Sequence, residues 1–127
     1  MTLAHPPPVV LVVEDEPLLR LNAVDLLEEA GYAVIEACDA DAAIELLAAR
    51  LDIRLVFTDI DMPGSMDGLR LAAAIRSRWP PIDIIITSGK VSPSPGDLPA
   101  RGVFLSKPYR GDALVGAADS FFTGLQA

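Results

Sequence analysis

Five short apolar runs, separated by longer stretches of mostly helical periodicity, constrain the fold of this chain more than any other feature. The runs occupy residues 9–13, 33–36, 55–58, 82–87 and 103–106. Each is too short for a typical helix and rich in apolar side chains, which favours a buried strand. Strands that alternate with helices form a parallel sheet with right-handed crossovers. The sequence therefore predicts an α/β fold with a five-stranded parallel sheet.

The first crossover is a predicted helix that starts at Pro17 and ends before Gly31. Proline suits the first turn of a helix, and glycine commonly follows the last. The residues at helical spacing that we expect on its inner side are Leu19, Ala23, Leu26, Leu27 and Ala30.

Three further helices are predicted. Asp39 or Asp41 can cap the second and Asp112 the last, because a side-chain oxygen there accepts from the first free backbone N–H groups. The helix between them covers residues 66–78 and ends before two prolines. Its basic residues are interpreted as a solvated face: Arg70, Arg76 and Arg78.

The fourth crossover, residues 90–101, loses the helical pattern. It contains Pro93, Pro95 and Pro99 together with Gly96. Proline removes a backbone donor and clashes with the preceding turn of a helix. We therefore expect a loop, or at most one turn, where a full helix would otherwise stand.

Length and composition fit one compact domain. The chain has 127 residues, of which 51% are hydrophobic and 22% charged. That length buries a substantial core. The three consecutive prolines near the N-terminus favour an extended, mobile tail over residues 1–8, with the domain over residues 9–127. The single cysteine, Cys38, is interpreted as a small, half-buried structural residue.

Charge and hydropathy exclude several classes of partner. The net charge is −8, and nucleic-acid binding depends on lysine and arginine, so we expect no direct nucleic-acid partner. No apolar run reaches the length of a membrane span, and the N-terminus lacks the pattern of a signal peptide. We expect a cytoplasmic protein with no membrane insertion.

Polar side chains follow four of the five predicted strands. They are Glu14 and Asp15 after the first, Asp59 after the third, Thr87 in the fourth and Lys107 after the fifth. The carboxyl ends of parallel strands share one edge, where ligands bind in open α/β sheets. If the first and third strands are neighbours, three carboxylates converge there, which favours a hard cation such as Mg²⁺. A nearby lysine and hydroxyl suit a phosphoryl group.

Four motifs in register resemble the receiver domains of two-component response regulators. They are Leu11 to Pro17, Thr58 to Gly64 with Asp67 and Gly68, Ile84 to Ser88, and Ser106 to Pro108 followed by the aromatic Tyr109. The likeness spans residues 9 to about 123. It implies a flavodoxin-like doubly wound sheet in the order 2-1-3-4-5.

The resemblance also implies roles for individual residues. Asp59 matches the phospho-acceptor, which takes the phosphoryl group from a phosphohistidine of a sensor histidine kinase or a phosphotransfer protein. Glu14 and Asp15 match the acidic pair that holds Mg²⁺ together with Asp59 and the backbone carbonyl of Asp61. Lys107 matches the lysine that pairs with the phosphoryl oxygens.

Two further positions match the switch of the family. Thr87 corresponds to the hydroxyl that moves toward the phosphoryl group, and Phe104 to the aromatic side chain that follows it. On this reading the chain is a stand-alone receiver. It accepts and loses a phosphoryl group without conventional turnover, and its altered surface signals to a downstream protein.

Three features depart from the usual family pattern. Glu14 stands where many receivers have aspartate, and residues 90–101 are short and rich in proline where a fourth helix is usual. Asp61 and Gly89 occupy positions that tune the lifetime of the phosphoryl group in this family.

Three alternatives remain at the level of sequence. Phe57 to Asp61 is also similar to the nucleophile motif of haloacid-dehalogenase-type phosphatases, which are Mg²⁺-dependent. A flavodoxin would share the fold, although the acids at 14–16 suit its phosphate poorly. A degenerate receiver would act as a phosphorylation-independent docking module.

Overall fold

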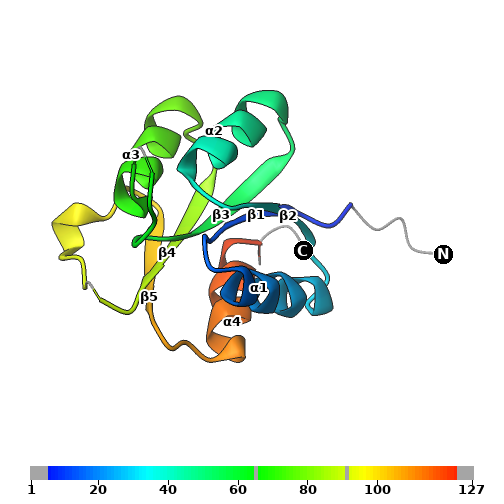
Figure 1. Cartoon of the computed structure of the whole chain (residues 1–127). Coiled ribbons are helices and arrows are strands. Elements are labelled where there is room, and N and C mark those ends of the chain that lie inside the picture. The colour runs from blue at the N-terminus through cyan, green and yellow to red at the C-terminus, as the bar shows by residue number, and fades with distance from the viewer. Residues whose placement is uncertain (1–5, 65, 91, 123–127) are drawn as a thin grey trace.

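The computed structural model describes residues 6–64, 66–90 and 92–122, so the first five residues of the predicted tail lie outside it. All five strands are parallel, in the order β2-β1-β3-β4-β5, which confirms the predicted fold (Figure 1). The strands are β1 (Val9–Val13), β2 (Ala33–Ala37), β3 (Ile53–Asp59), β4 (Asp83–Ser88) and β5 (Gly102–Ser106).

Four α-helices cover both faces of the sheet. They are α1 (Pro17–Glu29), α2 (Ala40–Ala49), α3 (Gly68–Arg78) and α4 (Gly111–Phe122). Helices α2 and α3 lie on one face, and α1 and α4 on the other (Figure 1). The sheet is therefore the middle of three layers, as expected for a doubly wound fold.

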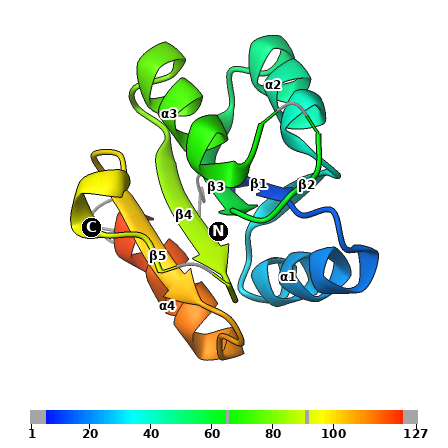
Figure 2. The same cartoon turned by 60° about the vertical axis from the view of Figure 1, so that its left-hand side comes forward.

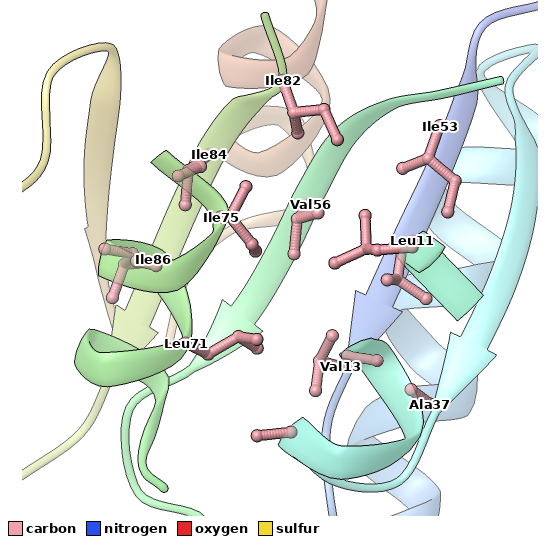
Figure 3. Packing of buried hydrophobic residues seen from close by; sticks show 14 of the residues in the cluster. Leu11, Val13, Ala37, Ile53, Val56, Leu71, Ile75, Ile82, Ile84 and Ile86 are labelled. Carbon is pink, nitrogen blue, oxygen red and sulfur yellow. The ribbon is translucent and has the colours of Figure 1, made fainter. Parts of the chain in front are cut away.

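Each face of the sheet buries its own hydrophobic cluster. On the α2 and α3 face, Leu11 and Val56 pack against Leu71 and Ile75 (Figure 3). On the other face, Val12 and Phe57 belong to the cluster that contains Leu27 of α1 and Leu114 of α4. Both faces of β1, β3 and β4 are thus withdrawn from water, which explains why these strands read as continuous apolar runs.

The helix starts partly follow the predicted caps. Asp39 caps α2, since its side chain accepts from the backbone N–H of Ala42 at 2.9 Å. Helix α3 begins at Gly68, two residues later than predicted, because Asp67 caps it instead. The cap predicted at Asp112 is wrong. Helix α4 begins at Gly111, with Asp112 inside its first turn, and the Arg110 carbonyl accepts the first helical hydrogen bonds.

Three predicted burials are also wrong. Leu19 and Ala30 are exposed, because the buried stripe of α1 runs through Ala23, Val24 and Leu27 and leaves them outside it. Cys38 is exposed rather than half-buried, since it follows the end of β2 where the chain turns away from the sheet.

Among the described residues of the segment that replaces a fourth crossover helix, the helical structure is one 3₁₀ turn, Pro95–Asp97, which confirms the predicted loop (Figure 2). Arg76 holds the end of this segment. Its guanidinium donates to the Ala100 carbonyl at 2.7 Å and also to the Pro80 carbonyl. Arg76 is therefore half-buried and structural, not part of a solvated face as predicted.

Candidate functional site

The strand order brings the predicted polar residues to one edge of the sheet. Strand β3 lies between β1 and β4, with Val13 opposite Thr58 and Asp59 opposite Thr87. Ser88 at the end of β4 is opposite Ser106, which precedes Lys107. The four chain segments that follow β1, β3, β4 and β5 therefore begin side by side at the same edge of the sheet.

Three carboxylates converge at this edge around one lysine. Glu14, Asp15 and Asp59 each offer an oxygen, and these oxygens lie within 4.8 Å of one another. The Lys107 ammonium donates to Glu14 Oε1 at 3.1 Å and to Asp59 Oδ2 at 3.0 Å. Both of those carboxylates are buried, at 5% exposure each.

Burial and pairing shift the pKa values of this cluster. Burial raises the pKa of Glu14, and the nearby Asp59 carboxylate adds to that, although hydrogen bonds from the Glu16 N–H and Lys107 oppose it. Burial alone would lower the pKa of Lys107, but its hydrogen bonds to Asp59 and Glu14 outweigh the loss of water and raise it. Lys107 is therefore held in its charged form by the acids that it joins.

The backbone around Asp59 is tightly packed. The N–H of Asp61 donates to Asp59 Oδ1 at 3.2 Å, and the N–H of Ile60 donates to the Thr87 carbonyl at 2.9 Å. A Cβ atom added at Gly68 would lie 2.0 Å from the Asp59 carbonyl oxygen. Only glycine fits there, so the start of α3 rests directly on the backbone of Asp59.

The hydroxyl of Thr87 has no partner in the described part of the chain. The residue is 1% exposed, and its Oγ1 is buried without a hydrogen bond. Buried polar groups are normally satisfied, and an unsatisfied one carries a cost. Since Thr87 lies opposite Asp59 in the sheet, this hydroxyl is a donor held beside the carboxylate cluster.

The side chain of Asp61 is tied to the neighbouring strand. Ser88 Oγ donates to Asp61 Oδ2 at 2.7 Å and accepts from the N–H of Lys90 at 3.1 Å. The apolar run before Thr87 predicts that Ser88 lies at this edge, but it does not predict the hydrogen bond to Asp61, because that bond depends on which loop lies opposite.

The residues of this edge fit a divalent cation. Three carboxylates outnumber the one lysine among them, so the cluster retains negative charge. All the side-chain ligand atoms are oxygens, which is the donor set that Mg²⁺ prefers. The more exposed Asp15 leaves part of the coordination sphere to water or a phosphate oxygen.

Comparison with known proteins agrees with this geometry. The family model described as "Response regulator receiver domain" matches residues 10–119. The chain belongs to the response regulator receiver domains. Members of this family bind Mg²⁺ at an acidic pocket and accept phosphoryl groups from histidine kinases.

Two curated relatives are much longer proteins that this chain matches only in part. The chain is 35% identical over 115 residues to the nitrogen assimilation regulatory protein NtrX of Azorhizobium caulinodans, covering 84% of this chain and 24% of that protein. It is 38% identical over 108 residues to the sensor kinase CckA of Brucella abortus, covering 79% of this chain and 11% of that protein. The receiver therefore spans a quarter or less of the length of these relatives.

Solved receiver structures share the fold. A response regulator receiver protein from Sinorhizobium medicae superposes with a TM-score of 0.85 at 26% identity, over 92% of this chain and 95% of that chain. None of the helices in the described ranges of this receiver has the length and apolar character needed to cross a membrane.

Two aromatic residues flank the lysine of the receiver. Phe104 is half-buried on β5, opposite Ile86, and packs against the cluster under α2 and α3. Tyr109 lies on the other face, where its ring meets Phe57 edge-on with centroids 5.6 Å apart. In the sequence, Lys107 therefore lies between two aromatic residues, one packed in each hydrophobic cluster.

Proposed function

We propose that this receiver acts as a phosphorylation-controlled switch, in which Asp59 accepts a phosphoryl group from a phosphohistidine. The observation that carries the proposal is the arrangement of three groups: a buried Asp59 carboxylate, the Lys107 ammonium bound to it, and the unpartnered Thr87 hydroxyl one strand away. These are an acceptor, a cation and a donor placed for one phosphoryl group. Residues 9–127 would form this unit.

In the transfer step, an Asp59 carboxylate oxygen forms a bond to phosphorus as the bond between phosphorus and the donor imidazole nitrogen breaks. The electron pair of the broken bond returns to that nitrogen. Glu14, Asp15, Asp59 and the backbone carbonyl of Asp61 would hold Mg²⁺, which neutralises charge on the phosphoryl oxygens. Hydrolysis of the resulting acyl phosphate by water would return the receiver to its resting state.

The switch would follow from the new charge at Asp59. A phosphoryl group brings oxygens that accept hydrogen bonds strongly, and Thr87 Oγ1 has a donor to give. Movement of Thr87 toward them displaces the end of β4, and Phe104 on the adjacent strand would repack in response. The Lys107 ammonium would then donate to a phosphoryl oxygen in place of its present hydrogen bond to Asp59.

The donor protein would dock beside the carboxylate edge, over the first half of α1. This helix starts next to Glu14 and exposes Leu18, Leu19 and Leu21, at 75%, 43% and 54%. Such an apolar patch beside an acceptor suits the helices of a sensor histidine kinase or phosphotransfer protein. The downstream target would be a protein that reads the altered surface around β4 and β5.

Intact-mass spectrometry after incubation with acetyl phosphate and Mg²⁺ tests the acceptor. We expect one phosphoryl adduct on the native chain and none on Asp59→Asn or when EDTA removes the metal. Asp25→Asn is the matched control, because it makes the same change of acid to amide at an exposed position of α1 outside the carboxylate cluster. An adduct that persists in Asp59→Asn would refute the assignment.

The same experiment separates the remaining alternative from the proposal. Membership of the receiver family sets aside the phosphatase and flavodoxin interpretations. A phosphorylation-independent docking module would give no adduct on the native chain. A Thr87→Val variant separates the switch from the transfer. If it still gains the phosphoryl adduct, but the backbone amide NMR signals of β4 and β5 no longer shift on phosphorylation, Thr87 acts in the switch rather than in the transfer.

A further inference from the structure

A pocket of about 260 Å³ lies at the opposite edge of the sheet from Asp59. It opens where β3 and β4 begin, and Figure 3 shows Ile53 and Ile82 at that end of the two strands. Its remaining lining residues are Arg50, Leu51, Arg54, Arg78, Trp79, Pro80 and Pro81. The proposed phosphoryl transfer uses none of them.

The charge of this edge is opposite to that of the whole chain. The segments 50–54, 76–83 and 99–102 lead into β3, β4 and β5, and they carry five arginines and two aspartates. The chain as a whole has a net charge of −8. The pocket therefore lies in a basic patch that attracts acidic partners, while the rest of the surface repels them.

The arginines of the pocket are available for an anion. The Arg78 guanidinium lies over the Trp79 ring at 4.4 Å from its centroid, and that of Arg54 lies over Phe122 at 5.6 Å. In the described ranges neither forms an ion pair with a carboxylate. Arg50 is held by Asp52 in an exposed pair, which water and salt weaken.

The apolar part of the pocket is also left uncovered. Leu51 at its rim is 97% exposed, and Trp79, Pro80 and Pro81 form a stiff wall beside it. Tryptophan and arginine are the residues that most often dominate binding at protein interfaces. A pocket of this size accepts one apolar side chain, and the guanidinium groups around it accept carboxylates on either side.

We propose that this pocket docks a linear segment of a partner protein in which an apolar side chain is flanked by glutamate or aspartate. The apolar side chain would fill the space between Leu51 and Trp79, and the acids would pair with Arg50 and Arg78. Because the pocket and Asp59 lie at opposite edges, the segment binds whether or not Asp59 carries a phosphoryl group.

Trp79 is the single tryptophan of the chain, so its fluorescence reports on this pocket alone. The probe is a ten-residue peptide of alternating Glu and Leu, titrated at low salt into the full chain. We expect a saturable change in Trp79 emission that weakens as salt is added. A peptide of alternating Lys and Leu should give none, and one of alternating Glu and Ser a much weaker one.

Variants test the two halves of the pocket. Arg50→Glu should weaken binding about tenfold, which corresponds to about 1.4 kcal/mol, and Leu51→Ser should weaken it several-fold. Both side chains are exposed enough to leave the fold intact. Arg70→Glu is the matched control, since it reverses an exposed charge on α3 outside the pocket, and it should leave affinity within about twofold.

Three outcomes would overturn the proposal. They are the absence of saturable binding by the Glu and Leu peptide, equal binding of the Lys and Leu peptide, and equal losses in Arg50→Glu and Arg70→Glu. A shift of Trp79 emission with protein concentration alone would assign the pocket to a second copy of this chain instead. Binding by Asp59→Asn should equal that of the native chain, so a failed phosphoryl transfer leaves this test unaffected.

Discussion

The two edges of the sheet hold their charges in opposite ways. At the carboxylate edge, Glu14 and Asp59 are buried and share one ammonium group. At the opposite edge, here called the arginine edge, Arg50 and Arg78 of the pocket keep contact with water and lie against an exposed acid or an aromatic ring. The free energy of a buried charge depends strongly on each of its neighbours, whereas an exposed charge is screened by water and depends little on them. The first edge suits chemistry that needs fixed geometry, and the second suits reversible contact with a partner.

One ion pair at the arginine edge has a buried carboxylate, as have those at the carboxylate edge. Asp83 is 6% exposed, Arg101 Nε donates to its Oδ1 at 2.9 Å, and Arg101 Nη2 forms an ion pair with the same oxygen at 2.7 Å. Arg101 adopts a positive φ of 63°, which arginine rarely does. Burial, rather than the edge on which a charge lies, therefore sets how strongly it is coupled. One substitution tests the fixed geometry of the carboxylate edge, and three more test the distinction between buried and exposed charges.

Gly68→Ala should have the largest effect, because the new Cβ would lie 2.0 Å from the Asp59 carbonyl oxygen. We expect a loss of about 3 kcal/mol in the free energy of unfolding, measured by urea denaturation. Gly116→Ala is the control, since a Cβ there meets nothing within 4 Å in the middle of α4. It should stabilise the fold by up to about 1 kcal/mol, and equal effects would contradict the close contact.

Lys107→Met should be next, because it leaves the buried Glu14 and Asp59 carboxylates without their cation. We expect a loss of about 2 kcal/mol in EDTA. Saturating Mg²⁺ should stabilise the variant more than the native chain, since a divalent cation would replace the missing charge. A loss of the same size with and without Mg²⁺ would show that the lysine does not share its carboxylates with a metal.

Arg101→Gln should cost slightly less, about 1 to 2 kcal/mol, since Asp83 remains buried but can keep a neutral donor. Urea denaturation near neutral pH measures this. The loss should shrink in an Asp83→Asn background, where the buried negative charge is already removed. A loss of the same size in that background would mean that the ion pair does not carry the effect.

Arg50→Gln should have the smallest effect, because its pair with Asp52 is exposed. We expect the urea midpoint to stay within experimental error of the native value. Asp52→Asn breaks the same pair from the other side and should behave alike. A clear loss in either variant would contradict the distinction between buried and exposed charges.

The sequence was informative wherever a strand ends in a polar residue. Val9 to Val13 and the apolar run before Asp59 are too short to be helices, so they placed Glu14 and Asp59 at one edge. Neighbouring strands then brought Thr87 and Lys107 beside them. The residue pattern therefore predicted the edge on which these side chains lie, and the strand order implied by the family resemblance predicted which of them are neighbours.

Contacts between loops were not predictable in this way. Gly68 and Ser88 gave no periodic signal, because their roles depend on which backbone lies opposite them in space. Arg76 was misassigned for the same reason: helical spacing placed it on the solvated face, but its guanidinium donates to the Ala100 and Pro80 carbonyls. The predicted burial of Leu19 was wrong because helical spacing alone does not show which stripe of α1 faces the sheet.

The hydrogen bond between Ser88 and Asp61 links two events that would otherwise be separate. The carbonyl of Asp61 is a proposed metal ligand, and Ser88 adjoins the threonine that is proposed to move. If a bound cation changes the equilibrium between the two positions of the β4 end, then displacement of the β4 end must change the affinity for that cation by the same factor. Mg²⁺ affinity measured before and after acetyl phosphate treatment would therefore quantify the mechanical connection across these two strands.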